Sequence, residues 1–148
     1  MNIWDFQRTL NQRLLRINIL NALIGLALSR REGRIKGIGT QAIGWAIINI
    51  AIAVIGGGFT RRRLDKLEDP NAPEIQRKEK RNLRNILLVN CCLNPLYILG
   101  GWRFARSRGE GNPFMRGNGY GIMIQGAILA CFDTFHVWQL IRKEDDNA

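Results

Sequence analysis

The chain has 148 residues, 46% of them hydrophobic, and its 22 Lys+Arg against 12 Asp+Glu give a formal net charge of +10 and a pI near 10.6. This length leaves room for one domain. So basic a balance is typical of two classes, a soluble nucleic-acid binder with a basic face and a membrane protein that keeps its charges in loops and termini. The distribution of the charges decides between them, because long uncharged segments exclude the charged helix faces that a soluble bundle needs.

The first 30 residues predict a helix that begins at a membrane interface and then enters the membrane. Trp4 stands there beside apolar residues at helical spacing: Ile3, Phe6, Leu10, Leu14 and Ile17. Such an amphipathic N-terminal helix suits an interface. A first span over residues 10–30 follows if Arg13 and Arg16 extend their long side chains to the interface. A secretory signal peptide is the alternative, and the helical pattern at the front of the chain disfavours it.

Two further spans are predicted over residues 38–59 and 85–102. The run from residue 37 to residue 60 holds 24 residues without a charge, which is about 36 Å of helix against a hydrocarbon core of about 30 Å. The run over 85–102 holds 18 uncharged residues, at the lower edge of spanning length.

The basic segment between these spans, residues 61–84, predicts two helical extensions joined by a turn at "DPNAP", with Pro73 near a helix start. Together with the two terminal segments it holds 14 of the Lys and Arg residues, and the other two connections hold 8, so the positive-inside rule predicts a cytoplasmic loop and cytoplasmic termini. Arg61, Arg62 and Arg63 are candidates for contact with anionic lipid headgroups or an acidic partner. The alternative, favoured here, is a solvated anchor of topology.

A fourth span is predicted over residues 118–141. The glycine-rich stretch before it, "RGEGNPFMRGNGYG", lacks the preceding strand of a phosphate-binding loop. It therefore predicts a turn followed by close helix packing at Gly117, Gly119 and Gly121. The three cysteines and the single histidine do not have metal-ligand spacing, so neither a metal nor a cofactor is expected.

Asp133 and His136 lie one helical turn apart within this fourth span. Counted along antiparallel helices from the cytoplasmic boundary, Asp133 and Asn94 share a depth of about 13 to 15 Å, and His136 and Asn90 share about 9 Å. We expect both pairs to form in a buried polar cluster, with Arg16 as the rival ion-pair partner of Asp133. Three further asparagines are expected to join the cluster: Asn49, Asn18 and Asn21. Gln41 and Gln125 are expected nearer the outer boundary.

Three blocks of the sequence together suggest a family: "QAIGWAIINIAIA", "LRNILLVNCCLNPLYILGG" and "QGAILACFDTFHVW". Over about residues 37–141 the chain resembles small four-helix bacterial integral membrane proteins classed as a domain of unknown function. The resemblance implies a multi-pass protein of the bacterial inner (plasma) membrane and supplies no activity. It also implies that relatives often carry an aspartate where this chain has Asn94-Pro95, so a two-acid site in relatives is reduced here to Asp133.

The expected fold class is therefore all-α, a single integral membrane domain over residues 1–148, with a bundle of four transmembrane helices and an amphipathic N-terminal helix. The favoured function is a structural or partner-binding membrane module surrounded by anionic lipids, with a membrane-protein partner or a second copy as its contact. A small proton-coupled transporter or carrier that uses Asp133 is the alternative, because ionisable residues within a membrane often mark functional sites. A membrane enzyme is disfavoured, because a second acid, base or nucleophile is not evident. A nucleic-acid partner is not expected.

Overall fold

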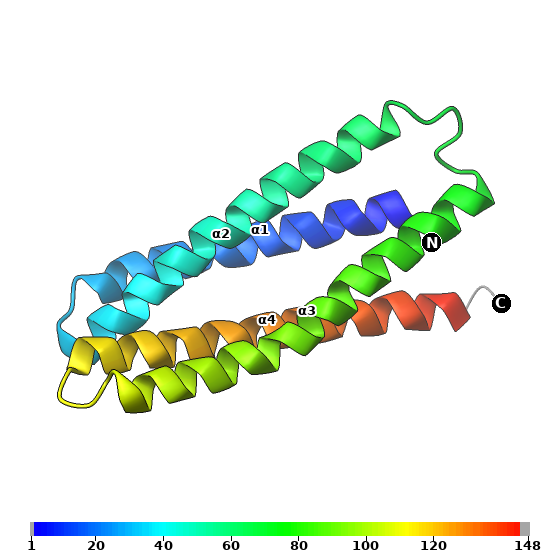
Figure 1. Cartoon of the computed structure of the whole chain (residues 1–148). Helices are drawn as coiled ribbons and strands as arrows, with labels where there is room; N and C mark the ends of the chain where they lie inside the picture. Colours follow the sequence, from blue (N-terminus) through cyan, green and yellow to red (C-terminus); the bar gives the residue numbers. More distant parts are fainter. Residues whose placement is uncertain (1, 146–148) are drawn as a thin grey trace.

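A computed structural model of the chain describes residues 2–145, with side chains as far as Arg142. Within this part, four helices run antiparallel: α1 (Ile3–Ser29), α2 (Gly33–Leu64), α3 (Pro73–Ser107) and α4 (Pro113–Asp145). The N-terminus, the turn from α2 to α3 and the far end of α4 lie together (Figure 1). The other two turns lie at the opposite end of the bundle, as alternate crossings require.

The helix boundaries follow local sequence signals. Asn2 caps α1, where its side chain accepts a 2.9 Å hydrogen bond from the Trp4 backbone N–H. Pro73 stands at the start of α3, as predicted. Gly33, the first residue of α2, and Gly111, in the turn before α4, have φ angles of 57° and 70°, a left-handed conformation that favours glycine. The helices are longer than the predicted spans, and the N-terminal amphipathic segment and the first predicted span form one uninterrupted helix.

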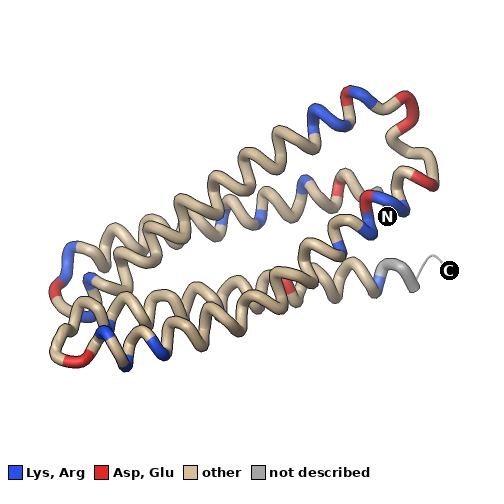
Figure 2. The backbone as a smooth tube through the Cα atoms, in the orientation of Figure 1, with Lys and Arg blue, Asp and Glu red and all other residues tan. Residues whose placement is uncertain are grey.

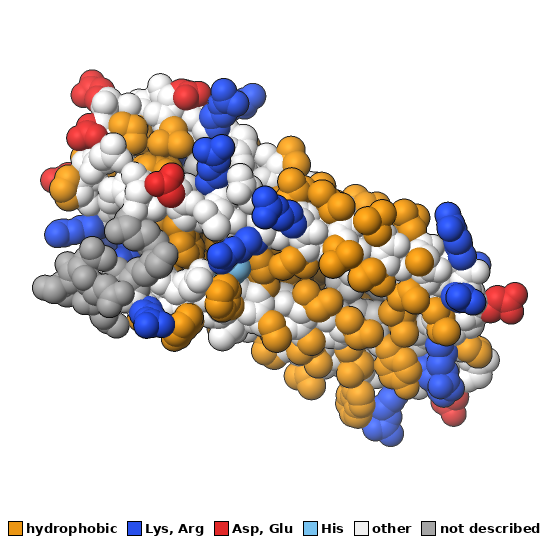
Figure 3. Space-filling model, turned by 180° about the vertical axis from the view of Figure 1, so that it is seen from behind, with side chains coloured by type: hydrophobic (Ala, Val, Ile, Leu, Met, Phe, Trp, Pro, Cys, Tyr) orange, Lys and Arg blue, Asp and Glu red, His pale blue; other side chains and the backbone are white. Residues whose placement is uncertain are grey.

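Charged residues gather at the two ends of the bundle, and the middle is almost free of them (Figure 2). Between the two charged ends, large apolar side chains point outward from all four helices, with exposed fractions of 36 to 62%. We call this surface the apolar belt; it covers much of the face shown in Figure 3. Its members include Leu20 and Leu23 on α1, Ile47 and Val54 on α2, Leu96 and Leu99 on α3, and Ile124 and Ile128 on α4.

Inside the apolar belt, the helices meet through small residues. A Cβ added to Gly119 would lie 2.6 Å from the backbone nitrogen of Ala105, and one added to Gly121 would lie 2.6 Å from Cβ of Gln41. Gly117 lies directly against the backbone of Arg34. These contacts confirm the close packing predicted for the three glycines, which draws α4 against α2 and α3.

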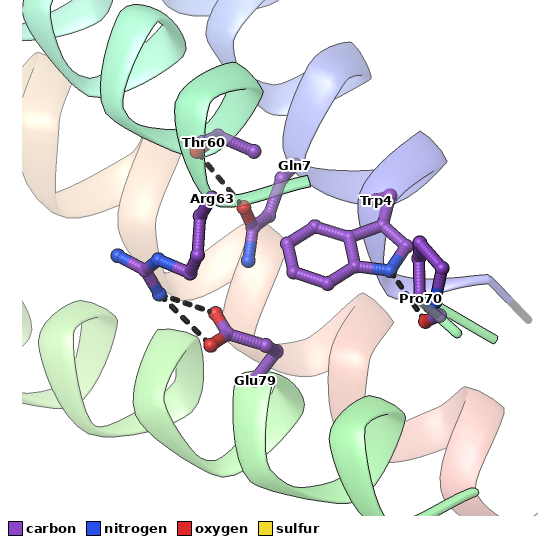
Figure 4. A network of polar contacts seen from close by, with 6 residues as sticks. All are labelled: Trp4, Gln7, Thr60, Arg63, Pro70 and Glu79. Atoms are coloured by element: carbon purple, nitrogen blue, oxygen red, sulfur yellow. Dashed lines mark hydrogen bonds and ion pairs between the residues drawn. The ribbon is translucent and has the colours of Figure 1, made fainter. Parts of the chain in front are cut away.

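We call the end that holds the N-terminus and the α2–α3 turn the head. Large apolar side chains are buried there, and the main members of this core are Ile3, Trp4, Phe6, Leu10, Leu87, Phe132 and Leu140. Polar contacts tie its segments together (Figure 4). The Trp4 indole donates a 2.9 Å hydrogen bond to the Pro70 carbonyl, and Thr60 donates one of 3.2 Å to Gln7.

Three of the described helices are long and apolar enough to cross a membrane: α2, α3 and α4, the last over Pro113–Arg142. The helix α1 is not among them, since polar and charged residues occupy its first half. The all-α bundle is confirmed, while the first span, predicted over residues 10–30 in α1, stays a prediction.

Candidate functional site

The predicted pair of Asp133 and Asn94 is present. The Asn94 Nδ2 group donates a 2.8 Å hydrogen bond to Oδ2 of Asp133, and the two residues are only 1% and 5% exposed. The bond joins α3 to α4 in the interior of the bundle. Asp133 therefore faces the interior of the bundle, with the predicted partner Asn94.

The other predicted members of the polar cluster form separate pairs rather than one network. Asn49 donates to Asn18 at 3.1 Å, which links α2 to α1. Asn21 and Gln125 exchange two hydrogen bonds, of 2.8 and 3.1 Å, which link α1 to α4. Gln125 lies eight residues before Asp133, about two helical turns farther from the head.

The predicted pairing of His136 with Asn90 is wrong. The His136 Nδ1 atom lies 2.7 Å from the Phe132 carbonyl oxygen in its own helix, and Nε2 lies 3.4 Å from Nη1 of Arg13. A carbonyl only accepts and a guanidinium only donates, so this arrangement requires a neutral imidazole with its proton on Nδ1. The Phe132 carbonyl, one helical turn away, and Arg13 of α1 occupy the two ring nitrogens of His136, which leaves no hydrogen bond for Asn90.

Arg16 is not the partner of Asp133. It lies on the other side of α4, in a groove between α1 and α4 that also contains Arg13 and His136. Arg16 does not compete with Asn94 for Asp133, because Asp133 faces a different cleft, on the other side of α4.

That cleft lies chiefly between α2 and α3 and has a volume of roughly 420 Å³. Its wall reaches from Arg63 and Glu79 in the head to Tyr97 in the apolar belt. Four of the predicted cluster residues line it: Asn49, Asn90, Asn94 and Asp133. Asn90 thus belongs to the site, with its side chain at the cleft and not at His136.

The three arginines that end α2 have different environments. Arg63 forms an ion pair with Glu79 of α3, with Nη1 2.7 and 2.8 Å from the two carboxylate oxygens (Figure 4). Glu79 is 6% exposed, whereas Arg61 and Arg62 are exposed. Arg63 is therefore committed to an internal partner, and Arg61 and Arg62 remain available to an external one.

Metal-ligating residues do not gather in the described part of the chain, where no three His, Cys, Asp or Glu side chains come together. The three cysteines are free thiols, and two of them, Cys92 and Cys131, are exposed. These two cysteines point to the surface of the bundle.

The fold and the site together define a small helical bundle with candidate membrane spans, a polar interior and a cleft that reaches an acidic side chain. The chain belongs to a family of unknown function, DUF6992, whose model matches residues 13–134. The match begins earlier than the predicted resemblance, and it includes Asn94 and Asp133 but ends before His136. A search of curated proteins and a search of solved structures both found no match.

Proposed function

We propose that the protein is an integral membrane module of four spans whose role is structural or partner-binding, and that it is not an enzyme. The apolar belt carries this proposal. Contiguous apolar patches larger than a few hundred Å² are rare on soluble monomers, and this one extends over all four helices. An apolar surface of this kind costs free energy in contact with water and does not in contact with lipid chains.

The second half of α1 supports the first predicted span, over residues 10–30. Ile17, Leu20 and Leu23 are 41 to 58% exposed and belong to the apolar belt. Arg13 and Arg16 stand just before them, where their long side chains would reach the interface. In this arrangement the polar first half of α1 lies in the head, outside the hydrocarbon.

The head is assigned to the cytoplasm of a bacterial cell, with the protein in the plasma membrane. It carries the termini and the α2–α3 turn, and these segments hold 14 of the 22 Lys and Arg residues. The positive-inside rule places the richer side in the cytoplasm.

Extraction and labelling test these assignments. We expect the protein to resist alkaline carbonate and to leave membranes only in detergent. In a variant without the three native cysteines, an impermeant maleimide should label Glu110→Cys on intact cells and label Asn71→Cys only after lysis. Release by carbonate would refute membrane insertion, and the opposite labelling pattern would refute the orientation.

The cleft favours a second candidate, a small proton-coupled carrier. It connects the head to Asp133, the acidic side chain inside the apolar belt, and the neighbouring amides of Asn90 and Asn94 line the same path. A carrier of this kind should pass protons into proteoliposomes under an imposed potential, as read by a trapped pH dye. Asp133→Asn should abolish that flux and leave folding intact, because an amide does not titrate. Equal flux in the variant and the original protein would exclude this candidate.

A further inference from the structure

A second concave surface lies on the other side of the bundle from the cleft, between α1 and α4. This α1–α4 groove has a volume of roughly 690 Å³ and lies at the edge of the apolar belt. Its lining is apolar apart from one end, and the apolar members are Ile17, Ala127, Ile128, Cys131, Phe132 and Phe135. A hydrocarbon chain matches such a lining.

Basic residues occupy the head end of the α1–α4 groove. Arg13 is held in place there, since its Nη1 donates a 3.2 Å hydrogen bond to Oε1 of Gln139 and its guanidinium carbon lies 5.8 Å from the centre of the Phe135 ring. Arg16 follows one turn closer to the apolar belt and is exposed. Figure 3 shows basic side chains along this border between the head and the apolar belt. Guanidinium groups bind phosphate oxygens in a bidentate manner.

A small polar pocket of roughly 290 Å³ begins on the head side of Arg13. Arg13 and His136 line both this pocket and the α1–α4 groove, so the two spaces meet at these residues. The pocket is also lined by polar residues of α1 and α4, among them Asp5, Thr9 and Gln139. The combined space is therefore polar at the head, basic at the border and apolar in the belt.

We propose that this combined space binds one anionic phospholipid. Its phosphate lies between Arg13 and Arg16, its headgroup enters the polar pocket, and an acyl chain follows the α1–α4 groove. Among the described residues that line this space, two arginines against the one carboxylate of Asp5 leave net positive charge, which selects an anionic lipid over a zwitterionic one. The proposal rests on the membrane insertion proposed above, and it replaces Arg61, Arg62 and Arg63 as the specific headgroup contact.

Lipid-dependent thermal stability of the purified protein in a neutral detergent tests the site. Phosphatidylglycerol should raise the melting temperature more than phosphatidylcholine does, and inorganic phosphate alone should leave it unchanged. The double variant Arg13→Gln/Arg16→Gln should bind phosphatidylglycerol about 30-fold more weakly, the equivalent of about 2 kcal/mol for two arginines near an anionic headgroup. The matched control Arg61→Gln/Arg62→Gln, which removes the same charge from an exposed position, should keep the original affinity.

A groove-filling variant makes the test independent of the arginines. Ala127 is exposed within the α1–α4 groove, so Ala127→Phe should displace the acyl chain and reduce the phosphatidylglycerol effect while both arginines remain. Equal stabilisation by the two lipids, an equal loss in the Arg61/Arg62 control, or a full effect of phosphate alone would each overturn the proposal. Resistance to carbonate extraction is measured separately, so a failed lipid site is distinguishable from failed membrane insertion.

Discussion

The hydrogen bond between Asn94 and Asp133 gives a quantitative prediction for the stability of the bundle. Both side chains are buried and their donor–acceptor distance is 2.8 Å. Interhelical hydrogen bonds in membrane proteins average about 0.6 kcal/mol and reach about 1.7 kcal/mol. For a short bond between two buried groups we expect a coupling free energy of about 1 kcal/mol, or roughly a fivefold change in the unfolding equilibrium.

A double-mutant cycle with Asp133→Ala and Asn94→Ala measures this coupling, because the packing that each substitution removes by itself cancels in the cycle. Unfolding by sodium dodecyl sulfate in mixed micelles, followed by circular dichroism, is a suitable assay. Asp133→Asn should retain most of the stability, since its amide oxygen still accepts from Asn94. Thr134→Ala, at the exposed neighbouring position, removes only a long, exposed 3.8 Å contact with Sγ of Cys91, so it serves as the control and should have little effect.

Two results would refute this reasoning. One is a coupling free energy indistinguishable from zero, which would mean that the Asn94 amide finds another partner at no cost. The other is an Asp133→Asn variant as unstable as Asp133→Ala, which would mean that the carboxyl group contributes something other than an acceptor for Asn94.

Two further predictions use the same unfolding assay. Gly119→Ala should lower the free energy of unfolding by about 1 to 3 kcal/mol, because the new methyl group would overlap the Ala105 backbone. The control Gly44→Ala, where a Cβ meets nothing within 4 Å, should be neutral or slightly stabilising. Equal effects of the two substitutions would contradict the close approach of α3 and α4. Arg63→Gln should destabilise the head, since it leaves the buried Glu79 carboxylate without its cation, and the loss should be only about 1 kcal/mol because Arg63 itself is half exposed. Adding Glu79→Gln should recover part of this loss. Additive effects of the two substitutions would rule out a coupled ion pair.

The sequence was a good guide to the features that depend on one helix at a time. Uncharged runs and Pro73 located the helices, and counting along α3 and α4 brought Asn94 to Asp133. These features follow from the rise of a helix and the polarity of its residues, which a single sequence states directly.

Features that depend on how helices diverge were not predictable in this way. Shared depth placed His136 beside Asn90, but the rotation and separation of two helices also decide which side chains meet. Close glycine contacts hold the helices together at one end of the bundle, and the helices spread toward the head (Figure 1). That spread opens the cleft and the α1–α4 groove, and it lets Arg13 reach His136.

The composition of the head core implies an order for the biogenesis of the protein. Its apolar side chains come from both the first and the last helices, such as Phe6 of α1 and Leu140 of α4. A ribosome completes α4 after the other three helices, so the apolar start of α1 meets all of its neighbours only once α4 has been synthesised. Until then its amphipathic face can rest on the bilayer surface, where such helices bind. Closure of the head is therefore expected to be the final step in the folding of this bundle.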